Sequence, residues 1–285
     1  MNGFAAALRC EVYAGLNTLG SKLVILLPAT LVLLQFAFNR LIAAGSQARD
    51  NLMGRGGFDA ALSEHAYGYL VDGLGTGLTL LGLLLVAQAA YSFSHDRDTG
   101  ALRHVIIRRA SRPAVVLAKL VYLHLLAAVA VALLLLASYL ASGWLWEFGA
   151  VVEDGFELIS EEEIRREIGL GLRLALIPLP AAIGFGLLVS VSANTATQAL
   201  AAALGGTLAL DLFKGLLGEN ALLLYARFQP SLLDQSYLAS VSRLVRGYSD
   251  VLVDERLLQF NTWVPLPTLL LFVFVTLWIV RRRKL

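Results

Sequence analysis

The chain has 285 residues, of which 58% are hydrophobic and 15% are charged, whereas charged residues make up roughly 25% of an ordinary soluble domain. Repeated apolar stretches reach about 20 residues, the length that crosses the hydrocarbon core of a bilayer. The composition therefore indicates an integral membrane protein and excludes a soluble globular one. A single cysteine, Cys10, excludes an internal disulfide framework, and the formal net charge of +2 says little until its distribution is known.

The N-terminal segment, residues 1–22, has apolar residues at three- and four-residue spacing. The apolar positions are Phe4, Leu8, Val12, Leu16 and Leu19. This spacing is typical of an amphipathic helix. We expect the helix to lie in the cytoplasmic interface of the membrane; the alternative is that it is only the start of the first span.

Six apolar stretches are predicted to span the membrane as helices. They comprise residues 23–44, 70–92, 114–141, 169–191, 199–217 and 263–280. Pro178 and Pro180 lie in the fourth stretch, where the loss of backbone donors predicts a kink or a split. The predicted fold class is an all-α integral membrane protein, with a single transmembrane domain over residues 1–285.

The distribution of charge predicts the orientation of these spans. An even number of spans places both termini on one side, and internal termini place the following bases inside: Arg9, Lys22, Arg97, Arg103, Arg108, Arg109, Arg112, Lys119, Arg281, Arg282, Arg283 and Lys284. Three acids accompany these twelve bases, which leaves eleven of the 23 bases and eighteen of the 21 acids outside. Because Lys and Arg favour the cytoplasmic side, we expect a multi-pass protein of the cell inner membrane with both termini cytoplasmic.

Two external segments, residues 142–168 and 218–262, are predicted to contain helices. Ser160 and Glu163 have the spacing of a reciprocal helix cap, so a helix should begin there and run into the fourth span. The acids around this helix form either a solvated face or a site for a cation or a basic partner. Residues 218–262 suggest one or two amphipathic helices, which either cover a substrate exit in the outer leaflet or pack on neighbouring loops.

Residues 93–113 form the largest internal loop and concentrate charge between two apolar spans. The segment from Ala101 to Arg109 places apolar residues on one helical face and basic residues on the other. Ser111 and Pro113 have the positions of a helix start for the third span. Such a short interfacial helix can present its basic face to a soluble partner, and the alternative is ordinary anchoring beside anionic lipid.

The stretch "FSHDRDTGALRHVIIRRASRPAVVLAKL" resembles the cytoplasmic loop of ABC-2-type transporter permeases. In that family an acidic residue, a Gly-Thr/Ala-Leu turn, an arginine-rich stretch, a Ser-Arg pair and a Lys-Leu pair recur in this order. The matching residues here are Asp98, Gly100, Ala101, Leu102, Arg108, Arg109, Ser111, Arg112, Lys119 and Leu120. The family often has glutamate where this chain has Asp98. The N-terminal helix, the six spans and the long link between the fifth and sixth spans also resemble that family.

The resemblance implies the transmembrane permease subunit of an ABC transporter, which couples ATP hydrolysis to export or to force transmission across the membrane. It implies a dimer with a second copy or a related permease, docked to two copies of an ABC ATPase subunit. The residues implied in coupling are Asp96, Asp98, Gly100, Leu102, Arg103, Val105, Ile106, Arg108, Arg109, Ser111 and Arg112. The alternative from another class is a membrane anchor or signalling subunit that docks a cytosolic partner and transports nothing.

The chain has no G-x-x-x-x-G-K-[ST] phosphate loop, so we expect no cofactor and no enzymatic activity in this chain, with ATP and Mg bound by the partner ATPase. The four histidines lack the spacing of a metal site, and the arginines lack the aromatic platform of a nucleic-acid surface. Membrane lipid and an external accessory protein are further candidate partners.

Asp211 and Lys214 are charged residues within the fifth predicted span. They lie three residues apart on one helical face, so they form either a structural ion pair or part of a substrate or partner pathway. Gly73 and Gly77 have the four-residue spacing that allows close contact between helices.

Overall fold

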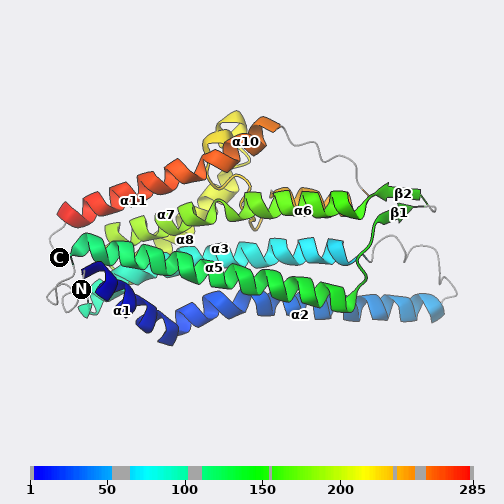
Figure 1. Ribbon diagram of the computed structural model, residues 1–285, viewed down its shortest axis with the longest axis horizontal. Helices are drawn as coiled ribbons and strands as arrows, with labels where there is room; N and C mark the ends of the chain where they lie inside the picture. The colour runs from blue at the N-terminus through cyan, green and yellow to red at the C-terminus, as the bar shows by residue number, and fades with distance from the viewer. Residues whose placement is uncertain are drawn as a thin grey trace.

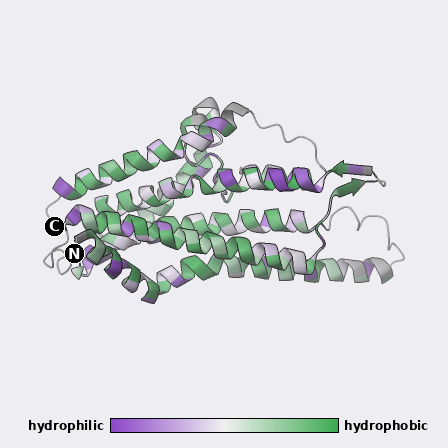
Figure 2. Ribbon diagram, viewed as in Figure 1, coloured by the Kyte–Doolittle hydropathy of each residue, from purple (hydrophilic) through white to green (hydrophobic). Residues whose placement is uncertain are grey.

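A computed structural model describes residues 3–52, 65–101, 111–153, 156–233, 236–247 and 255–282. Its long helices lie side by side, with both chain termini at one end of the bundle and a small β-hairpin at the other (Figure 1). We call these the terminal end and the hairpin end. Six helical segments in the described residues are long and apolar enough to cross a membrane, which agrees with the predicted multi-pass membrane protein. The hydrophilic residues gather at the terminal end of α11 and at the hairpin end of α6 (Figure 2).

The helices and strands follow one another in this order: α1 (Gly3–Asn17), α2 (Leu19–Leu52), α3 (Ala66–Asp98), α5 (Arg112–Leu145), β1 (Val151–Glu153), β2 (Phe156–Ile159), α6 (Glu161–Leu176), α7 (Leu179–Ser192), α8 (Ala196–Phe213), a 3-10 turn (Gly218–Leu223), α9 (Tyr237–Val245), α10 (Glu255–Trp263) and α11 (Pro265–Arg282). The helical fold class was predicted, but the antiparallel pair β1–β2 was not. Its strands flank the sequence Asp154-Gly155, and Asp-Gly between apolar residues is a strong hairpin signal. The segment 142–168 is therefore not a simple loop before a helix.

Several predicted span boundaries are corrected by the structure. The first spanning helix extends beyond 23–44 at both ends, since α2 runs from Leu19 to Leu52. The fourth span is formed by α6 and α7 together, because α6 begins at the predicted Ser160 cap and the chain is interrupted only at Ile177 and Pro178. The predicted 169–191 missed the first turns because their charged residues suggested an external segment.

The fifth spanning helix, α8, begins at Ala196 and ends at Phe213, whereas the prediction was 199–217. Thr195 caps its first turn, since the Thr195 side chain accepts a hydrogen bond from the Gln198 amide at 3.2 Å. At the other end the chain leaves the helix at Lys214, and the following residues turn back toward α3. Lys214 therefore ends the helix and does not lie within a continuous span.

The helix α3 occupies the centre of the bundle and packs against α2, α5, α7, α8 and α9. Its buried leucines recur at three- and four-residue spacing, as in Leu74, Leu78, Leu81 and Leu85. Glycines allow its neighbours to approach closely: a Cβ on Gly73 would lie 2.6 Å from the Phe36 ring. The predicted packing role of Gly73 and Gly77 is confirmed, because each faces side chains of adjacent helices.

The helix α1 is joined to the bundle along one side. Leu8 and Val12 pack partly buried against the core, whereas Leu16 and Leu19 remain exposed. Gly15 lies against Tyr122 of α5, and the Tyr122 hydroxyl is 2.7 Å from the Ser21 hydroxyl. The helix α1 is therefore packed on α5, and the exposed Leu16 of α1 and Leu19 of α2 remain available to lipid.

Candidate functional site

The residues implied in coupling fall into two groups. Leu102, Arg103, Val105, Ile106, Arg108 and Arg109 lie outside the described residues. Asp96, Asp98, Gly100, Ser111 and Arg112 are described, and they flank that segment on either side. The structure therefore locates the two ends of the loop and the helices to which they belong.

Both ends of the loop are well-formed helix termini. The chain leaves α3 at Gly100, whose φ of +76° lies in the left-handed region that favours glycine, and its amide donates to the Arg97 carbonyl at 3.0 Å. On the other side, the Ser111 side chain accepts a hydrogen bond from the Ala114 amide at 3.4 Å and so caps α5. A displacement of the loop would therefore act directly on α3 and α5.

A buried lysine joins three helices at this end of the bundle. The Nζ atom of Lys119 in α5 lies 2.8 Å from a carboxylate oxygen of Glu11 in α1 and 2.5 Å from one of Asp96 in α3. Its side chain is only 3% exposed. A buried charge is tolerated when charged partners of this kind surround it. The ion pairs of Lys119 therefore fix the relative positions of α1, α3 and α5.

The surroundings of Lys119 also shift the pKa of Glu11. Burial raises the pKa of the Glu11 carboxyl, and the nearby ammonium of Lys119 opposes that shift. The direction indicates that removal of solvent outweighs the attraction of the cation at this carboxyl. Loss of Lys119 would therefore leave Glu11 in a site that disfavours its charge.

Asp98 links α3 to a fourth helix. Its carboxylate accepts a hydrogen bond of 2.7 Å from the backbone amide of Ala196, the first residue of α8. A helix N-terminus has unpaired amides and a partial positive charge, so it favours a carboxylate there. At the end of α3, Asp96 thus contacts Lys119 of α5, which also pairs with Glu11 of α1. Asp98 contacts α8.

Ser190 of α7 completes this arrangement. Its hydroxyl oxygen accepts hydrogen bonds from the backbone amides of Ser94, at 3.0 Å, and Phe93, at 3.2 Å. We call the group of Glu11, Asp96, Asp98, Lys119 and Ser190 the terminal junction. It connects the loop-bearing end of α3 to α1, α5, α7 and α8.

The sequence indicated only part of the terminal junction. Asp96, Asp98 and Lys119 belong to the quoted motif, but Glu11 and Ser190 were not identified as partners. Lys119 lies within the predicted third span, and a charged residue inside a span calls for a partner. That rule would have led to a search for acids near the internal surface, where Glu11 is one of three.

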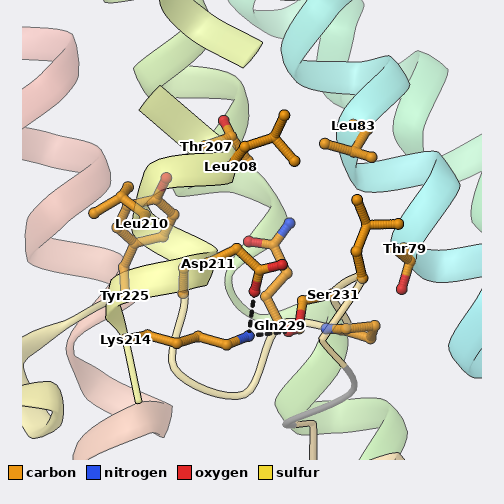
Figure 3. A pocket seen from close by; sticks show the side chains of 13 residues that line it. Thr79, Leu83, Thr207, Leu208, Leu210, Asp211, Lys214, Tyr225, Gln229 and Ser231 are labelled. Atoms are coloured by element: carbon orange, nitrogen blue, oxygen red, sulfur yellow. Dashed lines mark hydrogen bonds and ion pairs between the residues drawn. The ribbon is translucent and has the colours of Figure 1, made fainter. Parts of the chain in front are cut away.

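Asp211 and Lys214 form the ion pair that their spacing suggested (Figure 3). Their charged atoms are 2.8 Å apart, and Lys214 Nζ also donates to the Gln229 carbonyl at 3.4 Å. The Lys214 side chain is 1% exposed. The adjoining cavity has a volume of about 30 Å³, which is room for only one or two water molecules. Lys214 is thus buried, and the place of the pair in a pathway stays a prediction.

At the hairpin end, polar contacts fasten α9 and α6 to α3. Asp72 of α3 accepts a hydrogen bond from the Ser242 hydroxyl at 2.5 Å and forms an ion pair with Arg246. The Tyr237 hydroxyl donates to Glu167 at 2.6 Å, and burial raises the pKa of Tyr237. The helix α9 therefore packs on spanning helices. The alternative predicted from the sequence, packing on neighbouring loops, does not describe these contacts.

The acidic residues near α6 are partly used inside the protein. Glu161 accepts hydrogen bonds from the Tyr67 hydroxyl and from Arg165, each at 2.6 Å. Within the described parts of the chain, no group of three or more His, Cys, Asp or Glu side chains could hold a metal ion. Glu161 and Glu167 therefore have structural partners and are not simply part of a solvated face.

Comparison with known proteins adds no relative. No protein-family model matches the chain, and no curated protein matches it. The features of the chain that bear on function are therefore the six apolar helices, the terminal junction and the sequence of the loop that the junction flanks.

Proposed function

We propose that the chain is the transmembrane permease subunit of an ABC-2-type transporter. In this proposal both termini and the loop between α3 and α5 are cytoplasmic, and a separate ATPase docks on that loop. The complex contains two permease chains and two ATPase subunits. ATP hydrolysis in the partner drives export or force transmission through the spanning helices.

The observation that carries the proposal is the terminal junction. The loop begins at the end of α3, the central helix of the bundle, and the last turn of α3 is tied to α1 and α5 through Lys119 and to α8 through Asp98. A load applied to the loop is therefore delivered to several spanning helices at once. Transport by rigid-body switching needs a connection of this kind between the driving subunit and the helices that move.

The distribution of charge supports the orientation. The terminal end carries the last turn of α11 with Arg281 and Arg282, and the sequence of the loop adds further arginines. The hairpin end carries Glu161, Glu162 and Glu163 in the first turn of α6. Basic residues at the terminal end favour its cytoplasmic placement.

The alternative function is a membrane anchor or signalling subunit that binds a cytosolic partner without transport. An anchor requires docking on the loop but does not require the loop to be tied to α8. A change at Asp98 therefore distinguishes the two functions, because Asp98 lies beside the loop and makes the contact with α8.

The single cysteine allows a direct test of orientation and partner. In a Cys10→Ser background, Arg103→Cys and Arg109→Cys place one thiol in the loop, and Gly45→Cys places a matched thiol near the opposite end of α2. We expect a membrane-impermeant maleimide to label only Gly45→Cys in intact cells. Labelling of Arg103→Cys from outside would overturn the proposed orientation.

The same thiols identify the partner. A bifunctional crosslinker applied to permeabilised cells should join Arg109→Cys to a nucleotide-binding ATPase, identified by mass spectrometry. With that ATPase co-purified, Asp98→Asn, Leu102→Ala and Arg109→Ala together should abolish the effect of the membrane subunit on ATP hydrolysis. Arg281→Ala, which removes a base at the same end, is the control. ATPase activity that is unchanged in a folded triple variant would favour the anchor function.

A further inference from the structure

Two adjoining cavities form a groove along the hairpin half of α3. The deeper one has a volume of about 490 Å³ and lies between α2, α3, α9 and the segment around Ser231. The second, of about 370 Å³, is lined by Asp72 together with residues of α9 and its N-terminal flank. Asp72, Ala239 and Ser242 line both cavities, so the two adjoin. We call them together the lateral groove.

The lateral groove reaches the middle of the bundle. Its α3 wall extends from Val71 to Leu83, which is about 18 Å at 1.5 Å per residue. The chain between α8 and α9 descends to the same depth, since a Cβ on Gly82, halfway along α3, would lie 2.7 Å from the Gln229 amide nitrogen. Irregular backbone at membrane depth is tolerated only inside protein or beside a polar, water-filled cavity.

The lining of the groove has polar and apolar parts. Asp72, Thr76 and Thr79 of α3 and Gln35 of α2 are polar, whereas the apolar part is lined by Val71, Leu80 and Leu83 of α3, Leu31 of α2 and Leu232. Leu31 is 38% exposed and Leu232 is 65% exposed, so the groove is open to lipid along this side. An occupant with one polar and one apolar part matches this division.

Two buried polar atoms in the groove lack a protein partner. Gln35 Oε1 and Ser231 Oγ have no hydrogen-bond partner among the described residues, although buried polar atoms are nearly always paired. Both residues line the deeper cavity. They indicate that water or the polar part of a ligand occupies it.

The shallower cavity carries excess positive charge. Its charged lining residues, within the described parts of the chain, are Asp72, Arg243 and Arg246. Asp72 is paired with Arg246, so Arg243 is not offset by a second acid in this lining. An anionic headgroup fits this site, and arginine is well suited to bind phosphate or carboxylate oxygens.

We propose that the lateral groove binds a single-chain amphiphile with an anionic headgroup, whose chain lies against Leu31 and Leu232 and whose headgroup lies beside Arg243. Ligand cavities commonly have volumes of roughly 300 to 1,000 Å³, and each of the two cavities lies within that range, so one acyl chain and one headgroup each have room. The inference deepens the proposed function by assigning a substrate class to the permease. The Asp211–Lys214 pair lies at the inner end of the groove. Thr79 and Ser231 line both the deeper cavity and the small cavity beside this ion pair.

Binding is tested with the full chain in phosphatidylcholine nanodiscs and radiolabelled lysophosphatidylglycerol as the probe. Lysophosphatidylcholine tests the headgroup charge, and phosphatidylglycerol tests the number of chains. We expect the protein to bind lysophosphatidylglycerol about tenfold more tightly than either. Equal binding of the three probes would overturn the proposal.

Two variants locate the site. Gly75→Leu should fill the groove without a clash, since a Cβ there meets no atom within 4 Å, and it should weaken binding at least about tenfold. Gly205→Leu on α8, also without a neighbour within 4 Å, is its control. Arg243→Gln should remove the preference for the anionic headgroup, and Arg49→Gln at the end of α2 should not. If Gly75→Leu does not fold, Ala239→Leu fills the groove from α9.

The groove-filling variants can also leave probe binding unchanged or alter the oligomeric mass of the chain. Binding that Gly75→Leu and Ala239→Leu leave unchanged would overturn the proposal. If these variants alter the oligomeric mass of the chain and not probe binding, the groove is covered by a second copy, and the proposal is wrong. The binding assay requires no ATPase, so it is independent of the proposed function. If the probe binds but the chain has no effect on ATP hydrolysis by its partner, the proposed function is refuted and the groove assignment stands.

Discussion

The ion pairs at the two ends of α3 differ in burial. At the terminal end Lys119 is 3% exposed and contacts acids from two other helices. At the hairpin end the Asp72–Arg246 pair is much more open, with the arginine side chain 52% exposed, and it borders two cavities. The first arrangement resists separation of the helices because separation would strand buried charge. The second contributes little to stability, because an exposed ion pair is screened by solvent.

In the proposed function this difference gives the two ends different tasks. The terminal junction fixes the helices with respect to one another and so can transmit a displacement. The hairpin end has an open groove and an exposed ion pair, so a ligand can enter there without breaking the core. The predictions below test this contrast by changing one end at a time.

The largest effect is expected from Lys119→Met, which removes the cation and leaves two acids without their partner. We expect a loss of about 3 to 5 kcal/mol in the free energy of unfolding, the range for breaking a buried ion pair by removing one partner. Thermal unfolding of the purified chain measures it. Lys22→Met, at an exposed position near the start of α2, is the control.

A rescue variant sharpens this prediction. Adding Glu11→Gln and Asp96→Asn to Lys119→Met removes the stranded charges, so part of the stability should return. Equal stability of the single and triple variants would show that Lys119 stabilises the protein through packing and not through its ion pairs.

A smaller loss is expected from Gly186→Ala in α7. A Cβ at this position would lie 2.8 Å from the backbone carbonyl oxygen of Val86 and from Ala89 Cβ, so the helices must separate. Overpacking of this kind destabilises a protein by about 1 to 3 kcal/mol. Gly75→Ala in the open groove is the matched control and should keep the stability of the parent chain.

Next in size is Asp98→Asn, which removes the charge at the start of α8. We expect a loss of about 0.3 to 1 kcal/mol in stability, the typical contribution of a charge at a helix terminus, together with a loss of ATPase coupling in the proposed complex. Thr195→Ala removes the cap that belongs to α8 itself. It should cost about as much stability without affecting coupling. Equal coupling in both variants would contradict the transmitting role of Asp98.

The sequence predicted the spanning helices well because their apolar length is dictated by the membrane. It also predicted the Ser160 cap and the pairing of Asp211 with Lys214, since both depend on residues three apart on one helix. Such local rules carry over directly from sequence to structure. The hairpin was missed although Asp154-Gly155 signals it.

Contacts between distant segments could not be predicted in the same way. Lys119 meets Glu11 across 108 positions, and Asp98 meets Ala196 across 98. A helical period identifies which residues share a face, but it does not identify the helix that the face will meet. The lateral groove was missed for the same reason, because α9 comes to lie on α3 only through a long segment that contains no α-helix.

The smallest effect is expected from the exposed pair at the hairpin end. Arg246→Gln should change the free energy of unfolding by no more than about 1 kcal/mol, because exposed ion pairs contribute little after solvent screening. The same variant should weaken binding of the anionic probe less than Arg243→Gln, since Arg246 is already paired with Asp72. Raising the salt concentration should reduce the effect of Arg246→Gln further, whereas the effect of Lys119→Met should persist in salt because its partners are buried. A loss for Arg246→Gln as large as that for Lys119→Met would show that the hairpin end is as rigid as the terminal end, and ligand entry would then have to occur elsewhere.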